Sequence, residues 1–221
     1  KHDSTYHDAW YNWGSTLAAR EDYANAIRKV KSGLKHHPHS FELLTLQVYG
    51  LRQMGAYDAA LARARRTREL LAQAQGAERA GHFADLLAAN EAAALRGLGR
   101  GRQARAVLLD LLRASPEACP NTIAELRFHD TRALPKARRM ELTVHVTPAD
   151  APGAEEDPGR SRSYQRTYWV IAPSAKEARR LIRELEPQDA AVRFEPSVNQ
   201  LEHHSNADQG VTERTPAIFA D

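Results

Sequence analysis

The spacing of apolar residues along the chain changes near residue 139. Up to that point the apolar positions recur with helical spacing, so this part of the chain is predicted to be helical. The run Met140–Thr147 alternates between apolar and polar residues, which predicts a β-strand. Tyr164–Ala172 is predicted to be a second strand. We therefore expect a helical part followed by a smaller part that contains a sheet.

A helix and a third strand are predicted after the second strand. Ser174 and Glu177 have the spacing of a capping box, which predicts a helix that continues to about Leu185. Ala190–Phe194 is then predicted to be a strand. Residues 140–202 thus form a small α/β module of order β-β-α-β. Because it is too small to bury a large core alone, we expect it to pack against the last helices.

The end of the chain carries a weaker pattern. Residues 203–221 are polar, contain Pro216 and show little periodicity. We expect an irregular tail, or a segment that lies over the body of the protein through Ile218 and Phe219.

Identical residues recur at fixed separations in the helical part. The pairs are Tyr23 with Tyr57 and Ala26 with Ala60 at a separation of 34 residues, and Gly55 with Gly99 at a separation of 44. The two glycines suit turns between helices, since glycine tolerates unusual backbone dihedrals. A repeat of 34 residues with one insertion of ten explains these matches. It predicts helix pairs at residues 7–40, 41–74 and 85–118, with 75–84 as a helix extension or an irregular linker and a capping helix at 121–128.

Residues of the first pair resemble the tetratricopeptide repeat (TPR), whose pattern is an early Trp, a Gly four residues later, an aromatic residue, a small Ala and a closing Pro. The matching residues are Trp10, Gly14, Tyr23, Ala26 and Pro38. The resemblance weakens in the second and third pairs. It implies a mainly α fold, with a TPR-like α-solenoid over residues 1–139 followed by the small α/β module.

The resemblance also implies where a partner binds, because in this family the first helix of each pair lines a concave groove. The residues carried over to that surface are Tyr11, Ser15, Glu42, Thr45, Tyr49, Arg52, Gln53 and Arg96. Tyr and Arg are common binding hot spots. The family's carboxylate clamp is absent, since Tyr11 and Ser15 occupy its positions on the first helix. The implied function is a protein-binding scaffold or adaptor that is not an enzyme. A bacterial immunity or secretion-associated role is a narrower version suggested by the Ala- and Arg-rich composition and by family analogy.

Composition excludes some other classes. Hydrophobic residues make up 42% and charged residues 27% of the chain, as in ordinary globular proteins. No apolar run approaches the roughly 20 residues that a membrane helix needs, so we expect no membrane span. The formal net charge of +3 is too small to indicate nucleic acid as a partner by itself.

Cysteine usage bears on the compartment. Cys119 is the single cysteine, which excludes an intramolecular disulfide and a cysteine-rich metal site. This favours a reducing compartment and hence the cytoplasm. The first residue, Lys1, is not Met, which leaves open a removed signal peptide and a periplasmic location.

Motifs for cofactors and metals are weak. The sequence GLGRG at 97–101 superficially resembles a phosphate-binding loop but lacks the following Lys-Ser/Thr, so we interpret it as a turn. His36, His37 and His39 cluster around Pro38 without the spacing of a known zinc motif. We expect no cofactor, no metal and no small-molecule ligand, although the sequence leaves open whether this histidine cluster binds a metal.

Two other functions remain as alternatives. The first is an enzyme with a site in the C-terminal α/β module, for which the candidates are His145, Tyr164, Arg166 and Glu184. The second is nucleic-acid binding through clusters of basic residues. These clusters are Arg63, Arg65, Arg66 and Arg68; Arg100, Arg102 and Arg105; and Arg127, Arg132, Lys136, Arg138 and Arg139. Aromatic side chains that stack on bases would be interleaved with such charges, but here the aromatics gather at 6–23, which disfavours this function.

Overall fold

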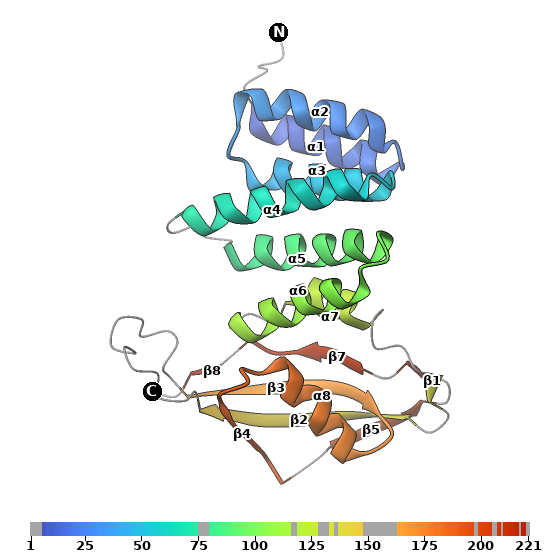
Figure 1. The fold of residues 1–221 in the computed structure, drawn as a ribbon, viewed down its shortest axis with the longest axis vertical. Helices are drawn as coiled ribbons and strands as arrows, with labels where there is room; N and C mark the ends of the chain where they lie inside the picture. Colours follow the sequence, from blue (N-terminus) through green and yellow to red (C-terminus); the bar gives the residue numbers. More distant parts are fainter. Residues whose placement is uncertain are drawn as a thin grey trace. The chain divides into compact units, whose positions relative to one another are not determined.

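The structure is a computed structural model in which the chain divides into two compact units, residues 1–107 and 108–221. The described residues are 6–74, 80–115, 119–127, 133–134, 137–147, 163–196, 199–204, 207–208, 210–216 and 218–219. The fold is mainly α with a small α/β module in the C-terminal part, as predicted (Figure 1). The division between the units falls within a helix, α6 (Gly101–Ala114).

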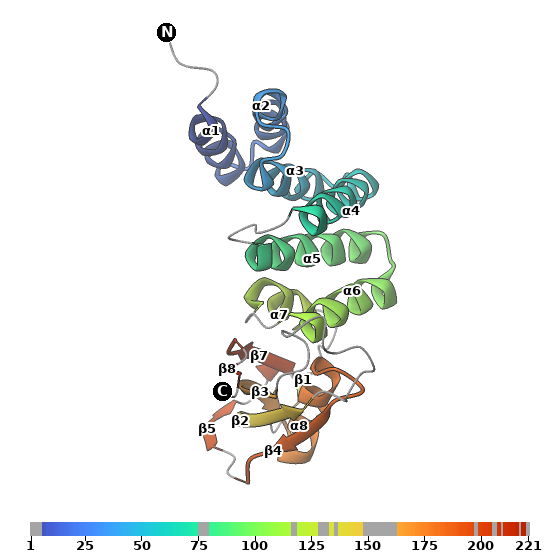
Figure 2. The same cartoon turned by 90° about the vertical axis from the view of Figure 1, so that its left-hand side faces the viewer.

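The first unit consists of helices that follow one another as antiparallel pairs (Figures 1 and 2). They are α1 (His7–Ala19), α2 (Tyr23–His36), α3 (Phe41–Gln53), α4 (Tyr57–Gln73), α5 (Ala80–Gly97) and the first half of α6. The first two predicted pairs are confirmed, with almost the predicted bounds. In Figure 2, α1 and α3 lie on one side of their pairs, and α2 and α4 on the other.

The third predicted pair begins earlier than expected. Helix α5 starts at Ala80 instead of residue 85, so the interpretation of 80–84 as a linker or an extension of the preceding helix was wrong. Residues 75–79 lie outside the described part of the chain. Packing of Phe83 explains the early start, because its buried ring lies 5.7 Å from the ring of Phe41.

Small residues let the helices of the first pair approach closely. A Cβ atom on Gly14 would lie 2.9 Å from Val30 Cγ2, and one on Gly33 would lie 2.7 Å from Trp10 Cβ. Neither position has room for a side chain unless its neighbours move. Gly55 serves a different purpose: its φ of +73° makes the turn between α3 and α4.

The second unit contains the predicted β-β-α-β module. Strands β2 (Ala137–Thr147), β3 (Tyr164–Ala172) and β4 (Ala191–Phe194) belong to an antiparallel sheet in which β2 lies between β4 and β3. Helix α8 (Ala175–Leu185) packs against β2 and β3. As predicted, the Ser174 hydroxyl caps this helix by accepting a hydrogen bond from the Glu177 amide at 3.2 Å. Helix α7 (Pro120–Arg127) occupies the predicted capping segment, of which Phe128 lies outside the described residues.

The C-terminal segment contributes strands to the sheet, so the expectation of an irregular tail was wrong. Strand β7 (Gly210–Arg214) pairs with β3, as does β8 (Ile218–Phe219), and β5 (Asn199–His204) pairs with β2. Two further strands, β1 (Ala133–Leu134) and β6 (Ala207–Asp208), form a separate two-stranded sheet. The other expectation for the tail, that it lies over the body through Ile218 and Phe219, agrees with the pairing of β8. Strands β7 and β8 form despite their weak apolar pattern because the edge of β3 supplies backbone hydrogen-bond partners.

Candidate functional site

A pocket of about 260 Å³ opens on the first unit among α1, α3 and α5. Its lining residues are Tyr11, Glu42, Thr45, Leu46, Tyr49, His82, Phe83, Leu86 and Asn90. All of them belong to the first helices of successive pairs. Four of the eight residues predicted to bind a partner therefore line one pocket, and they come from two different helices.

The base of this pocket is polar as well as apolar. Thr45 and Asn90 are only 6% and 8% exposed, although both line the pocket. Asn90 donates its Nδ2 to the backbone carbonyl of Leu86 at 2.8 Å. That donation fixes the orientation of the amide, because a carbonyl oxygen must be met by a donor. Asn90 Oδ1 and Thr45 Oγ1 have no hydrogen-bond partner.

Unpartnered polar atoms at such depth are costly. A buried polar group without a hydrogen bond costs about 1–3 kcal/mol. In native proteins such exceptions are few, and here both atoms are also covered from solvent. The two atoms belong to neighbouring helices, α3 and α5, and both side chains line the same pocket.

Glu42 supplies the negative charge among the lining residues. Its Oε2 accepts a hydrogen bond from Ser40 Oγ at 3.1 Å and lies 3.7 Å from His7 Nε2. Ser40 also caps α3, since its Oγ accepts a hydrogen bond from the Leu43 amide at 3.2 Å. The N-terminus of α3 therefore holds the carboxylate in place through Oε2. Within the described residues, Oε1 makes no polar contact.

Tyr49 is held at the pocket by neighbours on two helices. Gln53 Nε2 donates to the Tyr49 hydroxyl at 2.9 Å, and the Arg52 guanidinium lies 5.3 Å from the centre of its ring. The Tyr23 ring packs edge-on at 6.1 Å. Arg52 and Gln53, which we predicted to contact a partner, thus support Tyr49 and do not line the pocket themselves.

The remaining predicted residues lie apart from this site. The Ser15 hydroxyl donates to the backbone carbonyl of Asn12 at 3.1 Å. Arg96 is exposed in the last turn of α5. Neither residue lines the pocket.

Five pocket residues were missed: Leu46, His82, Phe83, Leu86 and Asn90. Four of these belong to α5, where the prediction began the repeat five residues too late. Their spacing could have revealed them, because His82, Leu86 and Asn90 follow one another at intervals of four and therefore share one helix face.

Of the residues proposed for an enzymatic site in the C-terminal module, Tyr164 and Arg166 lie together, with the guanidinium 5.2 Å from the ring centre, but His145 does not join them. Val144 pairs with Arg166 across the β2–β3 ladder, and His145 pairs with Gln165. Because successive side chains point to opposite faces of a sheet, His145 and Arg166 lie on different faces. His145 is exposed and contacts Glu195 at 3.1 Å.

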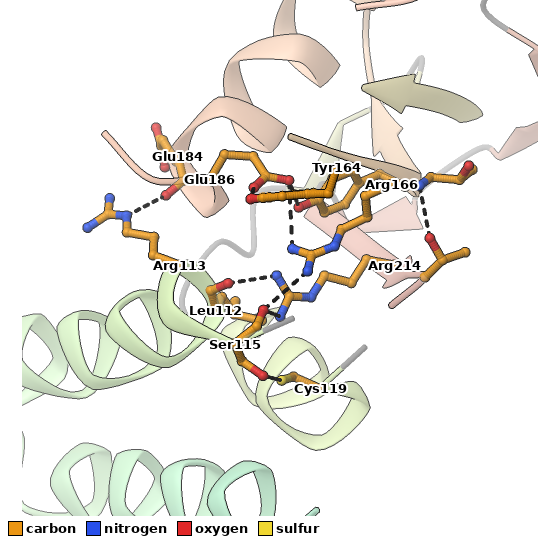
Figure 3. A network of polar contacts seen from close by, with 12 residues as sticks. Leu112, Arg113, Ser115, Cys119, Tyr164, Arg166, Glu184, Glu186 and Arg214 are labelled. Atoms are coloured by element: carbon orange, nitrogen blue, oxygen red, sulfur yellow. Dashed lines mark hydrogen bonds and ion pairs between the residues drawn. The ribbon is translucent and has the colours of Figure 1, made fainter. Parts of the chain in front are cut away.

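Arg166 and Tyr164 instead belong to a buried network centred on Glu186, shown in Figure 3. The hydroxyls of Tyr164 and Tyr168 donate to the two Glu186 carboxylate oxygens at 2.6 and 2.5 Å. Arg166 Nη1 lies 3.7 Å from the same carboxylate. Burial, reinforced by the Glu186 charge, raises the pKa of Tyr168 to about 12. Burial and the same charge also raise the pKa of Tyr164.

This network also caps the C-terminus of α6 (Figure 3). Arg166 Nη2 donates to the Ser115 carbonyl at 3.1 Å, and Arg214 Nη1 donates to the Leu112 carbonyl at 2.7 Å. Arg113 Nε donates in the other direction, to the Glu184 carbonyl at 3.0 Å. The last carbonyls of a helix lack partners within the helix, so guanidinium groups satisfy them here. The network joins α6 to the sheet and acts as a structural connection within the second unit.

The basic cluster on α4 is partly neutralised by ion pairs. Arg65 Nε and Arg68 Nη1 lie 3.2 and 2.6 Å from the two oxygens of the buried Glu91 carboxylate. Arg66 pairs with Glu69 at 2.8 Å. Of the third cluster, Arg132 and Lys136 lie outside the described residues. The α4 arginines therefore help to attach α4 to α5.

Histidines near residues 36–39 contact aromatic rings. The His36 ring stacks on Trp10 with centroids 6.2 Å apart, and the His37 ring meets that of His7 edge-on at 5.4 Å. Where the chain is described, no three His, Cys, Asp or Glu side chains are arranged to hold a metal ion. No helix in the described ranges has both the length and the hydropathy to span a bilayer.

Comparison with known proteins gives no family assignment. No family model matches the sequence, and no curated protein matches it either.

Proposed function

We propose that the chain is a protein-binding scaffold of the TPR type, in which the pocket among α1, α3 and α5 anchors a segment of another protein. The observation that carries the proposal is the pocket itself, which is lined entirely by residues of α1, α3 and α5, the first helices of the successive pairs.

The size of the pocket favours a peptide anchor. Small-molecule sites have volumes of about 300–1,000 Å³ and enclose most of their ligand. This pocket, at about 260 Å³, falls just below that range and matches one large side chain that enters from a longer segment. Tyr11 and Tyr49 at the pocket belong to a residue type that is enriched among binding hot spots.

The proposal can be tested with peptides displayed on phage and selected on the immobilised full-length chain. Selected peptides are then measured by fluorescence polarisation. Leu46→Glu places a charge in the apolar wall of the pocket and should abolish binding. Trp13→Ala is the matched control, because Trp13 is an exposed aromatic residue of α1 that does not line the pocket. Failure to select any peptide, or binding that Leu46→Glu leaves intact, would refute the proposed function.

A further inference from the structure

We infer that the outer face of the α1–α2 hairpin binds an acidic amphipathic helix of a partner protein. This outer face combines an aromatic stripe along α1 with a basic stripe along α2. Its residues are Tyr6, Trp10, Trp13, Leu17, Arg28, Lys29, Lys35 and His36. None of them lines the pocket, so the inference is independent of the proposed function.

The hairpin has one side packed against the rest of the first unit. Helix α3 contacts both α1 and α2 there. Figures 1 and 2 show the hairpin at one end of this unit, so its other side faces away from α3. In stacked helix pairs, the terminal pair normally carries a polar outer face. Aromatic residues at this position therefore indicate a surface that a further helix covers.

The aromatic stripe has the spacing of a helix-packing surface. Tyr6, Trp10, Trp13 and Leu17 follow one another at intervals of four, three and four residues, which places them on one face of α1. Tyr6 is 61% and Trp13 50% exposed, whereas Trp10 and Leu17 are half-buried. Such a stripe matches the apolar stripe of another amphipathic helix.

The basic stripe lies directly beside the aromatic one. Lys29 Nζ is 3.5 Å from the ring centre of Trp13, and the His36 ring stacks on Trp10. The two other basic residues of the face immediately precede Lys29 and His36, so the two pairs are one heptad apart and share a helix face. Helix α2 contains no Asp or Glu. Charge complementarity therefore selects a partner whose residues around the apolar stripe are acidic.

The contacts of the tryptophan rings disfavour nucleic acid as the partner. Bases bind such surfaces by stacking on the faces of aromatic rings. Here Trp10 and Trp13 stack on each other with an interplanar angle of 10°, and Lys29 lies over the Trp13 ring. Neighbouring side chains thus already engage these ring faces. Packing of a helix requires apolar contact with the exposed ring edges instead.

Charge and burial disfavour two other partners. In a two-fold dimer this face would meet its own copy and bring Arg28, Lys29 and Lys35 close to the same three charges. An anionic bilayer would attract these charges, but its anchoring side chains must insert into the lipid. Because Trp10 and Leu17 are half-buried, they are better reached by a ridge of side chains from another helix.

The test uses the full-length chain and a labelled peptide of about 20 residues, made of Ala, Leu and Glu with Leu at heptad positions a and d. The control peptide has the same composition, but its leucines are spread around the helix. We expect the striped peptide to bind at least about tenfold more tightly in fluorescence anisotropy. In a Trp169→Phe variant, the emission of Trp10 and Trp13 should shift to the blue as the peptide covers them.

Variants of the hairpin make the test specific. Trp13→Ala, and separately Arg28→Glu combined with Lys35→Glu, should each weaken binding about tenfold. The matched control is Arg100→Glu combined with Arg102→Glu. It changes the net charge equally at the exposed turn between α5 and α6 and should leave binding unchanged.

Three results would overturn the inference. One is equal binding of the two peptides, and another is an equal loss of binding in the two double variants. The third is binding of phosphatidylserine vesicles or of an oligothymidine strand that Trp13→Ala weakens, when the striped peptide does not bind; the partner would then be a membrane or a nucleic acid.

The pocket and the outer face can be tested separately. Leu46→Glu should leave binding of the acidic peptide unchanged, because Leu46 lies in the pocket and not on the outer face. Trp13→Ala should leave peptides of the pocket unaffected. Phage-selected peptides that depend on Trp13 but not on Leu46 would support the outer face and count against the proposed function.

Discussion

Removing the Glu186 charge should strongly destabilise the second unit. Glu186 is fully buried, and its two oxygens accept hydrogen bonds from Tyr164 and Tyr168. It also faces Arg166, whose side chain is only 2% exposed. In Glu186→Gln the shape is kept, but Arg166 loses its counter-charge.

The size of the effect follows from that burial. Removing one partner of a buried ion pair lowers the free energy of unfolding by about 3–5 kcal/mol, because the remaining charge stays in a poorly solvating environment. The amide of the new Gln can accept only one of the two tyrosine hydroxyls with its single oxygen, which adds to the loss. With a urea dependence of about 1.5 kcal/mol per molar, the unfolding midpoint should fall by about 2–3 M.

Urea unfolding can be followed for the second unit alone. Trp169 lies on β3, whereas the two other tryptophans, Trp10 and Trp13, belong to α1. Replacing both with Phe leaves Trp169 fluorescence as the reporter of the second unit. Glu184→Gln is the matched control, since Glu184 pairs with Arg180 on the exposed face of α8. Such a surface pair contributes about 0.3–0.5 kcal/mol.

The outcome discriminates clearly between a buried and a solvated network. If Glu186→Gln costs no more than Glu184→Gln, the carboxylate is not buried with Arg166 in solution and the reasoning fails. If the arginine alone is replaced, by Arg166→Met, a loss of similar size is expected, because Glu186 then becomes the unpaired buried charge.

Three further predictions concern titration and backbone packing. Folding raises the pKa of Tyr168 from 10.0 to about 12. The protonated hydroxyl therefore contributes fully to the free energy of unfolding below pH 10, and this contribution is lost as the pH rises to 12. The free energy of unfolding should fall by about 3 kcal/mol over that window, and urea titrations of Tyr168→Phe should show a smaller fall. Gly33→Ala should lower the free energy of unfolding by about 1–2 kcal/mol, because the new Cβ would lie 2.7 Å from Trp10 Cβ. This overpacking outweighs the gain in helix propensity from Gly to Ala. An unchanged melting temperature would contradict the close approach of the two helices. Gly55→Ala should cost about 1–2 kcal/mol through its φ of +73° alone, because no atom lies within 4 Å of the added Cβ. Gly55→Asn should cost less, and equal melting temperatures for the two variants would argue against the left-handed turn.

The helix pairs could be predicted because the repeat places its turns and close contacts at fixed positions. Gly55 and Gly99 both adopt φ of +73° between helices, as their separation predicted. The start of α5 could not be predicted in the same way. Gly76 and Gly81 lower the helix propensity of residues 75–84, and the packing of Phe83 against Phe41 overrides this preference from α5 onward.

The C-terminal strands escaped prediction for a different reason. Strands β7 and β8 span five and two residues, too few for an alternating pattern to be recognised. These two strands form because they pair with β3, and the local sequence does not encode that pairing. Arg166 carried a clearer signal, since it occupies an inward position in the alternation of β3. An arginine on the apolar face of a predicted strand indicates a buried carboxylate, here Glu186.

Buried polar groups are only partly satisfied in both units. In the second unit both Glu186 oxygens have tyrosine donors and the carboxylate faces Arg166, although Arg166 Nε is buried without a hydrogen-bond partner. In the first unit Asn90 Oδ1 and Thr45 Oγ1 are equally deep but have no partners, and both side chains line an open pocket. Because both atoms are also covered from solvent, leaving them unpaired lowers the stability of the first unit. Replacing Thr45 with Val, which keeps the shape and removes the unpaired hydroxyl, should therefore raise the melting temperature slightly, and a lower melting temperature would show that the hydroxyl has a partner in solution.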